Sequence, residues 1–370
     1  VDVFLGQGRF VSRDALEVGG ARLAFHRAVI ATGARAVAPD VPGLAGPGFY
    51  TNETIFTLTE RPRRLVVIGA GPIGCELAQS FQRLGSLVTL VARGPQIMPK
   101  EDRDAAAAVE RQMARDGVTI LFETKVVRAE SRGAERVLTL STGGREEGLA
   151  CDAVLAGVGR APNVDGLGLE AAGVRYSASG VEVDARLRTS NSRVFAAGDV
   201  CSRYQFTHAA DAMARIVIRN AFFFGRGRVT DLVMPWCTYT DPEIAHVGLH
   251  EAEAQAAGHD VGTITQEFRD VDRAILDGDE EGFARVHFDR KSGRILGATI
   301  VARHAGEMIG EVTVAMASGQ SVSRLSSTIH PYPTQAAALG RIGDAYMRTK
   351  LTPFVRGLFG KWFAWRLKTP

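Results

Sequence analysis

Apolar residues in the first part of the chain form short continuous runs separated by stretches with helical spacing. The runs at 66–68, 87–91 and 153–155 are typical of strands buried on both faces. Between the first two runs, apolar residues recur at helical spacing over 71–84, and Gly85 then predicts the end of a helix. This alternation predicts an α/β domain with a parallel sheet.

A different pattern begins at about Pro235. Short runs at 285–288 and 295–301 predict two strands joined by a polar turn, and the spacing over 305–318 predicts a helix. The second part of the chain therefore predicts a separate α+β domain.

Composition adds little about partners. The 370 residues, 45% of them hydrophobic, are enough for two or three domains. Basic and acidic residues number 44 and 41 and are spread along the chain, so the net charge does not point to nucleic acid. No apolar stretch approaches the ~20 residues that a membrane-spanning helix needs.

Cysteine usage favours a reducing, cytoplasmic location. The four cysteines lie far apart, with neither a CxxC pair nor the spacing of zinc ligands: Cys75, Cys151, Cys201 and Cys237. The first residue is valine and the pattern begins abruptly, so we expect the natural chain to start further upstream.

A glycine motif directly follows the first buried run. It reads GxGxxG and consists of Gly69, Gly71 and Gly74, with Pro72 and Ile73 between the last two glycines. We expect Gly69 to permit a tight turn, Gly71 to let phosphates approach the backbone, and Gly74 to let helix pack on strand. The helix N-terminus would add amide donors and a favourable dipole. The motif predicts dinucleotide binding, and a glycine-rich turn without a ligand is the alternative.

The end of the second run indicates which dinucleotide is bound. An acidic residue there would accept hydrogen bonds from the ribose of NAD, but the position holds Ala92, followed by Arg93. Arg93 can pair with a 2′-phosphate, and Lys100 can add to such a pocket. We therefore expect NADP(H) in preference to NAD(H), with a solvated surface arginine as the alternative.

Four more motifs occur along the chain in a fixed order. They are ATGA at 31–34, GVGRAPN at 157–163, TSN with VFAAGD between 189 and 199, and TDPEIAHVG at 240–248. Together with GxGxxG, they resemble the pyridine nucleotide-disulfide oxidoreductases, the group that includes dihydrolipoamide dehydrogenase, glutathione reductase and mercuric reductase. The resemblance extends to about Arg348.

The resemblance implies two Rossmann-like dinucleotide-binding domains and a C-terminal α+β dimerisation domain, and hence a homodimer. The NAD(P) domain would be inserted into an FAD domain that is incomplete here. The expected parts are the first FAD segment at 1–58, the NAD(P) domain at 59–157, the second FAD segment at 158–232, the dimerisation domain at 233–348 and a tail at 349–370.

Site residues also follow from the resemblance. Gly198 and Asp199 look like the motif whose aspartate binds the ribityl hydroxyls of FAD, and Glu76 looks like the glutamate near nicotinamide and flavin. A structural turn at 198–199 and a first-turn glutamate favoured by the helix dipole are the alternatives. Thr32 and Gly33 look like the chain crossing beside the FAD, and the other cofactor-binding positions implied are Gly159, His208 and Ala209.

The family's histidine and glutamate dyad is absent from its usual positions. Tyr332 and Ala337 stand there, and His330 is two residues out of phase. Tyrosine at this position is similar to mercuric reductases, where it lies over the substrate path, so Tyr332 is a candidate catalytic residue. The tail lacks the vicinal cysteines of mercuric reductases, so the acceptor, a small molecule or a metal ion, stays open.

Two further family features are missing before Thr32, namely the first GxGxxG and a Cys-x4-Cys pair. We therefore expect an NAD(P)H-dependent, FAD-containing oxidoreductase whose chain is truncated here and binds FAD poorly. The alternative is a non-catalytic remnant that binds nucleotide and dimerises. The aromatic and basic stretch at 353–368 favours packing on the dimer over contact with a membrane surface.

Overall fold

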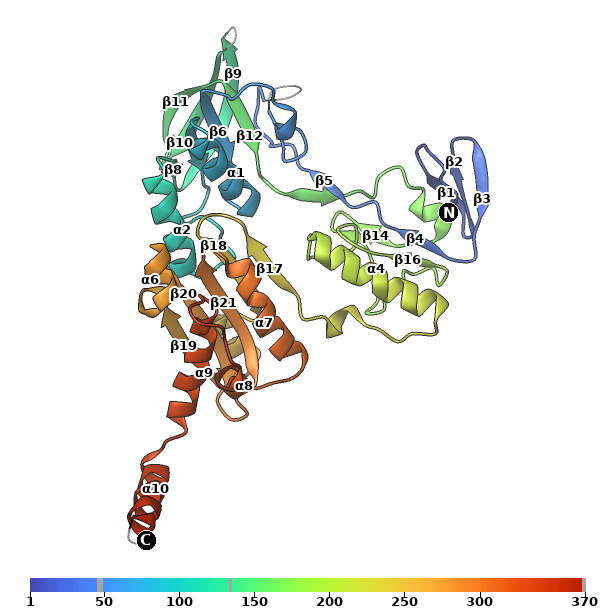
Figure 1. Ribbon diagram of the computed structural model, residues 1–370. Coiled ribbons are helices and arrows are strands. Elements are labelled where there is room, and N and C mark those ends of the chain that lie inside the picture. Colours follow the sequence, from blue (N-terminus) through green and yellow to red (C-terminus); the bar gives the residue numbers. More distant parts are fainter. Residues whose placement is uncertain (45–48, 133–134, 368–370) are drawn as a thin grey trace. The chain divides into compact units, whose positions relative to one another are not determined.

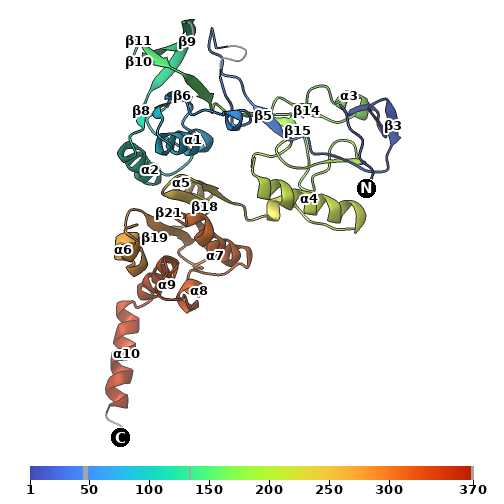
Figure 2. The same ribbon diagram turned by 45° about the horizontal axis from the view of Figure 1, so that its top comes forward.

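The computed structural model describes residues 1–44, 49–132 and 135–367. The chain divides into two compact units, drawn in Figures 1 and 2. Unit 1 comprises Val1–Thr59, Arg128–Glu130 and Val154–Leu232, and unit 2 comprises Glu60–Val127, Ser131–Ala153 and Val233–Pro370.

Unit 1 consists of short strands and one long helix. Its first sheet is an antiparallel meander of β1 (Arg9–Ser12), β2 (Ala15–Val18) and β3 (Ala21–Ala24). Strand β4 (Ala28–Ile30) pairs in parallel with β16 (Val194–Ala196), and β5 (Ala34–Ala36) pairs antiparallel with β13 (Arg160–Pro162). The remaining elements are η1 (Ile55–Thr57), α3 (Leu169–Ala172), β14 (Tyr176–Ser177), β15 (Gly180–Val181), α4 (Thr207–Phe222) and η2 (Val229–Asp231).

Apolar side chains from distant segments form the core of unit 1. Ile30 of β4, Val194 of β16 and Leu169 of α3 are buried in one cluster. Met213 of α4 packs with Phe195 in a second cluster. Both clusters depend on the pairing of β4 with β16, which brings the carboxyl ends of two parallel strands side by side.

The first half of unit 2 contains a β–α–β–α–β arrangement. Helix α1 (Pro72–Arg83) connects β6 (Arg64–Ile68) with β7 (Leu87–Val91), and α2 (Arg103–Arg115) connects β7 with β8 (Thr119–Leu121). The three strands are parallel, with β7 in the middle. Strand β9 (Thr124–Arg132) and the antiparallel pair β10 (Glu135–Thr142) and β11 (Arg145–Cys151) follow, and within β12 (Ala153–Ala156) the chain returns to unit 1.

The second half of unit 2 has a five-stranded antiparallel sheet in the order β17-β18-β21-β20-β19. These strands are β17 (Pro235–Thr238), β18 (Glu243–Gly248), β19 (Val261–Glu267), β20 (Phe283–Asp289) and β21 (Ile295–Ala302). The other elements are α5 (Glu251–Ala256), η3 (Phe268–Asp270), α6 (Asp272–Asp277), α7 (Ala305–Ala317), α8 (Ser323–Ser327), α9 (Ala337–Thr349) and α10 (Pro353–Arg366).

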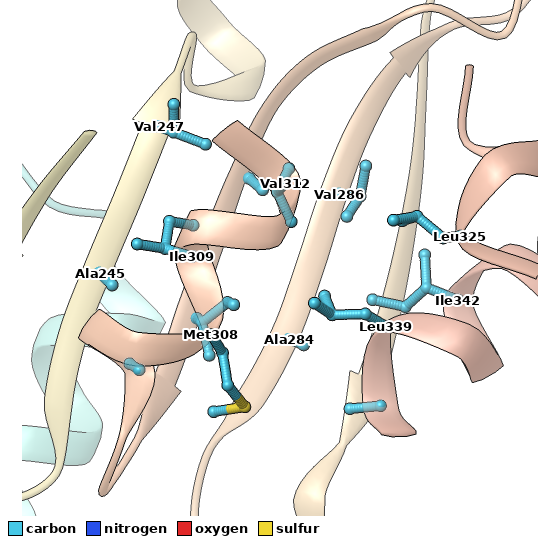
Figure 3. Close-up of a cluster of buried hydrophobic side chains, with 14 of the residues drawn as sticks. Ala245, Val247, Ala284, Val286, Met308, Ile309, Val312, Leu325, Leu339 and Ile342 are labelled. Atoms are coloured by element: carbon cyan, nitrogen blue, oxygen red, sulfur yellow. The ribbon is translucent and has the colours of Figure 1, made fainter. Parts of the chain in front are cut away.

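A continuous apolar core joins this sheet to its helices. Figure 3 shows Ile309 and Val312 of α7 beside Val247 of β18, with Leu339 and Ile342 of α9 beside strand β20. All of these side chains are buried in one cluster. Burial of one such side chain contributes about 1.5–3 kcal/mol, so this core fixes the positions of the loops at the ends of the strands.

The segments with the strongest patterns form the predicted elements. Residues 66–68 lie in β6, 71–84 correspond to α1, and 305–318 correspond to α7. The α/β class of the first part and the α+β class of the second are confirmed. The five-part domain division stays a prediction. In the described part of the chain, no helix combines the length and apolarity needed to cross a membrane.

Candidate functional site

The turn between β6 and α1 has the backbone geometry of a phosphate-binding turn. Gly69 has a φ of 106°, which strongly favours glycine. A Cβ on Gly74 would lie 1.9 Å from the carbonyl oxygen of Gly69, so only glycine lets α1 pack this closely. A Cβ on Gly71 would meet no atom within 4 Å, and its φ is −76°. The fold therefore does not require glycine at Gly71, whose missing side chain leaves room for a ligand.

Helix α1 begins at this turn without a side-chain cap. Gly71 is the N-cap residue, Pro72 is the first helical residue and Ile73 is the second. The amide of Cys75 donates to the carbonyl of Gly71 at 3.0 Å, which is the first bond inside the helix. The amides before Cys75 have no acceptor within the helix, and together with the dipole they favour an anion.

The carboxyl end of β7 lies beside this turn, because the amide of Gly69 donates to Val91 at 3.0 Å. The next residue, Ala92, is buried and brings no charge to the position where NAD-binding domains carry an acid. Arg93 is exposed, and among the described residues it forms no ion pair or hydrogen bond. Its guanidinium is therefore available to a phosphate.

Glu76 lies on α1, two residues after the last glycine of the motif. Its Oε1 accepts a hydrogen bond from the amide of Tyr239 at 2.8 Å, and burial raises the pKa of Glu76 above its usual value. Gln79 of the same helix exchanges two 2.8 Å hydrogen bonds with the backbone of Asp241. The TDPE motif thus packs directly on α1, a contact that the sequence analysis did not anticipate.

In unit 1, two motifs are joined where the chain leaves β4. The hydroxyl of Thr32 donates to the carbonyl of Asn163 at 2.8 Å, and the Asn163 amide donates back to the carbonyl of Thr32 at 2.9 Å. Gly33 has a φ of 68°, and a Cβ there would meet no atom within 4 Å. Asn163 belongs to GVGRAPN, and this position in the motif was the only sequence signal for its role.

Asp199 follows β16 and has a charged partner. Its Oδ2 lies 2.7 Å from Nη1 of Arg160, and both side chains are largely shielded from solvent. Another guanidinium nitrogen of Arg160 donates to the carbonyl of Ala34 at 3.1 Å, which fixes the arginine on β5. Gly198 has a φ of 79°, so the turn before the aspartate favours glycine. The ion pair orients the Asp199 carboxylate, and sequence reasoning missed this role of Arg160.

The remaining cofactor-binding candidates of unit 1 are Gly159, His208 and Ala209, whose surroundings indicate a ligand less clearly. Gly159 has a φ of 128° and open space where a Cβ would lie. His208 is in the first turn of α4, exposed, and its ring stacks on Phe206 with centroids 5.3 Å apart. Ala209 is buried. The role of these positions stays a prediction.

Tyr332 and His330 have separate partners within unit 2. The phenol of Tyr332 is 79% exposed and donates to the Oδ2 of Asp272 at 3.0 Å. His330 Nε2 lies 3.0 Å from Oε2 of Glu311, and its side chain is only 10% exposed. Ala337 is the first residue of α9. The exposed phenol can contact a substrate or a second subunit, whereas His330 is held inside its own unit.

A polar cluster elsewhere in unit 2 contains Glu101, His246 and His250. In the described part of the chain, these are the three potential metal ligands whose ligand atoms lie within 4.8 Å of one another. However, the two imidazole rings stack with centroids 3.8 Å apart and planes 24° apart. An imidazole lone pair lies in the plane of its ring, so two stacked rings do not direct their lone pairs at one ion.

Hydrogen bonds hold this cluster instead. Trp236 donates to Oε1 of Glu101 at 2.9 Å, and Thr299 Oγ1 lies 2.8 Å from Nδ1 of His246. Burial lowers the pKa of His246 to about 3 and raises the pKa of Glu101, which favours the neutral form of both groups. The cluster is a polar part of the core.

Comparison with known proteins agrees with the geometry. Residues 1–214 match the family model described as pyridine nucleotide-disulphide oxidoreductase. Residues 234–341 match the model for the dimerisation domain of the same family.

Individual relatives cover nearly all of this chain. Over 339 residues the chain is 34% identical to a mercuric reductase of Bacillus cereus, a match that covers 91% of this chain and 54% of the relative. It is 36% identical over 355 residues to a dihydrolipoyl dehydrogenase of Thermus scotoductus, covering 93% of this chain and 75% of the relative. The chain thus spans about half the length of the first relative and three quarters of the second.

A solved structure has the same fold. The HOCl-induced flavoprotein disulfide reductase RclA from Escherichia coli superposes with a TM-score of 0.85 at 30% identity, and the match covers 93% of this chain and 79% of RclA.

Proposed function

Since this chain belongs to the pyridine nucleotide-disulphide oxidoreductase family, we propose that it is part of an NAD(P)H-dependent, FAD-containing oxidoreductase. The observation that carries the proposal is the turn at Gly69–Gly74, where one glycine is required by packing and another leaves room for a ligand. The uncapped N-terminus of α1 adds amide donors at the same turn.

We further propose that NADPH is preferred to NADH. Ala92 leaves no carboxylate to bind a ribose 2′-hydroxyl, and Arg93 has no acidic partner among the described residues. A guanidinium can form a bidentate, charge-assisted contact with the 2′-phosphate of NADPH. Glu76, oriented by Tyr239, would lie toward the nicotinamide end of the bound dinucleotide.

We propose that residues of unit 1 hold the ribityl chain of FAD. The ion pair with Arg160 orients the Asp199 carboxylate, and its Oδ1 can accept from a hydroxyl. The Thr32–Asn163 bonds hold the neighbouring backbone at Gly33. When bound, FAD supplies the acceptor for the nicotinamide hydride.

Titration calorimetry with NADP⁺ and NAD⁺ tests the nucleotide preference. The variant Arg93→Ala should bind NADP⁺ about ten- to a hundredfold more weakly, because a hydrogen bond to a charged group contributes about 1.5–3 kcal/mol. Its affinity for NAD⁺ should be unchanged. Arg145→Ala, at an exposed arginine on β11, is the control. Equal affinity of the wild-type chain for both nucleotides would contradict the preference.

A second candidate function is a nucleotide-binding, dimerising remnant without catalysis. Tyr332 and Ala337, in place of the family's histidine and glutamate, favour it. Visible spectra after addition of FAD distinguish the two functions. Flavin absorbance that bleaches with NADPH supports the oxidoreductase. Because this chain is expected to bind FAD poorly, the remnant is supported only if a chain extended upstream also binds nucleotide without retaining flavin. Sedimentation equilibrium tests the homodimer that the dimerisation domain implies.

A further inference from the structure

The last helix of the chain, α10, has clear helix-start signals in its sequence, but none of its side chains is buried. Thr352 caps it by accepting a hydrogen bond from the amide of Val355 at 3.3 Å, and Pro353 occupies its first turn. The helix has 14 residues, none of them buried, and is drawn in red at the C-terminus in Figure 1. Phe354 and Trp365 of the helix are exposed by 80% and 63%, and Leu367, directly after it, by 88%.

Helical spacing separates α10 into two different faces. Large apolar side chains share one broad face, namely Phe354, Val355, Leu358, Phe359, Trp362, Phe363 and Trp365. The opposite face carries Arg356, Gly357, Gly360, Lys361 and Ala364, while Arg366, at the last position of the helix, falls between Val355 and Phe359 on the apolar side. Neighbouring rings on the apolar face contact one another, since the centroids of Trp362 and Phe363 are 5.0 Å apart. The guanidinium of Arg366 lies 5.4 Å from the centre of the Trp362 ring.

The charge around α10 has a single sign. After Asp344 the sequence contains six lysines and arginines and no acidic residue. The other 38 basic residues and all 41 acidic residues precede Ala345, so the rest of the chain has a small excess of acid. The net positive charge of the chain thus comes from the segment that carries the exposed aromatic face.

We propose that α10 binds the surface of an anionic membrane, with its apolar face among the acyl chains and its cations among the lipid phosphates. A helix with an aromatic face and lysine or arginine on the other face has the composition of an interfacial helix. The helix is about 21 Å long at 1.5 Å per residue, shorter than the ~30 Å hydrocarbon core, so it would lie along the surface.

The sequence alone favours packing of this stretch on the dimer, but a second α10 is the weaker match for the same face. Lysine is depleted in protein interfaces, and two α10 helices packed together would bring like charges close without an acidic partner on either helix. An anionic bilayer can contact both faces of α10, because its phosphates can pair with the cations while the hydrocarbon below them takes up the apolar face. This inference does not depend on the proposed enzymatic function.

Vesicle flotation of the 370-residue chain tests the proposal. The chain should float with phosphatidylcholine vesicles that contain about 30 mol% phosphatidylserine, and only weakly with phosphatidylcholine alone. Trp362→Glu should weaken binding at least tenfold, because it removes a large buried apolar group and adds an anion. Lys361→Gln should weaken it about fivefold, the effect expected of one cation near an anionic surface.

Two control variants test whether a loss of flotation comes from the apolar face of α10 or from substitution in general. Ala364→Gln changes the polar face of the same helix, and Leu84→Glu places an acid at an exposed leucine outside it; both should float like the wild-type chain. If the wild-type chain does not float with anionic vesicles, the proposal is wrong. It is equally wrong if Trp362→Glu floats like the wild-type chain. If that variant instead shifts only the dimer equilibrium in sedimentation, the apolar face belongs to a contact with a second copy and the proposal is wrong.

Discussion

Adding one methyl group should lower the stability of the fold at one glycine of this turn and the affinity for dinucleotide at another. In Gly74→Ala, the new Cβ would lie 1.9 Å from the carbonyl oxygen of Gly69, so α1 must move away from β6. Overpacking of a tight contact costs about 1–3 kcal/mol. In Gly71→Ala, the Cβ meets no atom and the φ of −76° suits alanine. We expect that variant to keep its stability and to lose dinucleotide affinity.

Urea unfolding and calorimetry measure the two effects separately. A loss of about 1–3 kcal/mol lowers the unfolding midpoint of Gly74→Ala by about 1 M if the m-value is about 1–3 kcal/mol/M. Gly71→Ala should unfold at the wild-type midpoint and bind NADP⁺ at least tenfold more weakly. The reasoning fails if Gly74→Ala unfolds like the wild type, or if Gly71→Ala binds NADP⁺ normally.

Two other predictions concern protonation. Burial lowers the pKa of His246 to about 3, so below about pH 6.5 the unfolded chain binds a proton that the folded chain does not. Stability should therefore fall by up to about 1.4 kcal/mol per pH unit between pH 6 and 4, and His246→Gln should lose this part of the slope in urea titrations. The hydrogen bond to Asp272 raises the pKa of Tyr332. In Asp272→Asn, ultraviolet titration should show one tyrosine ionising at lower pH, and an unchanged titration would refute the contact.

Local patterns were sufficient for elements whose neighbours are close in sequence. Strand β6, helix α1 and strand β7 form one short unit, so apolar spacing and three glycines specify it. The same holds for α7, whose apolar residues recur at helical spacing.

Pairings between distant residues could not be predicted in this way. Strand β18 pairs with β21, about fifty residues later, and the two strands between them in sequence, β19 and β20, lie on the other side of β21 with β19 at the edge. The contact of Arg160 with Asp199 also depends on the folded chain, because no local signal links the two residues. The β1–β3 meander has strands of four residues, too short for a clear alternation, and its Phe10 packs edge-on against Phe25 at 5.8 Å.

The divided course of the chain has a consequence for biosynthesis. Ala28 of β4 pairs with Val194 of β16, and the whole first half of unit 2 is encoded between them. At roughly 5–20 residues per second, about 10–30 s of translation separate the two strands. During that time β4 has an unpaired edge outside the ribosome, whereas β6, α1 and β7 can already fold among themselves. The inserted half should therefore acquire protease resistance on the ribosome before the unit that surrounds it in the sequence.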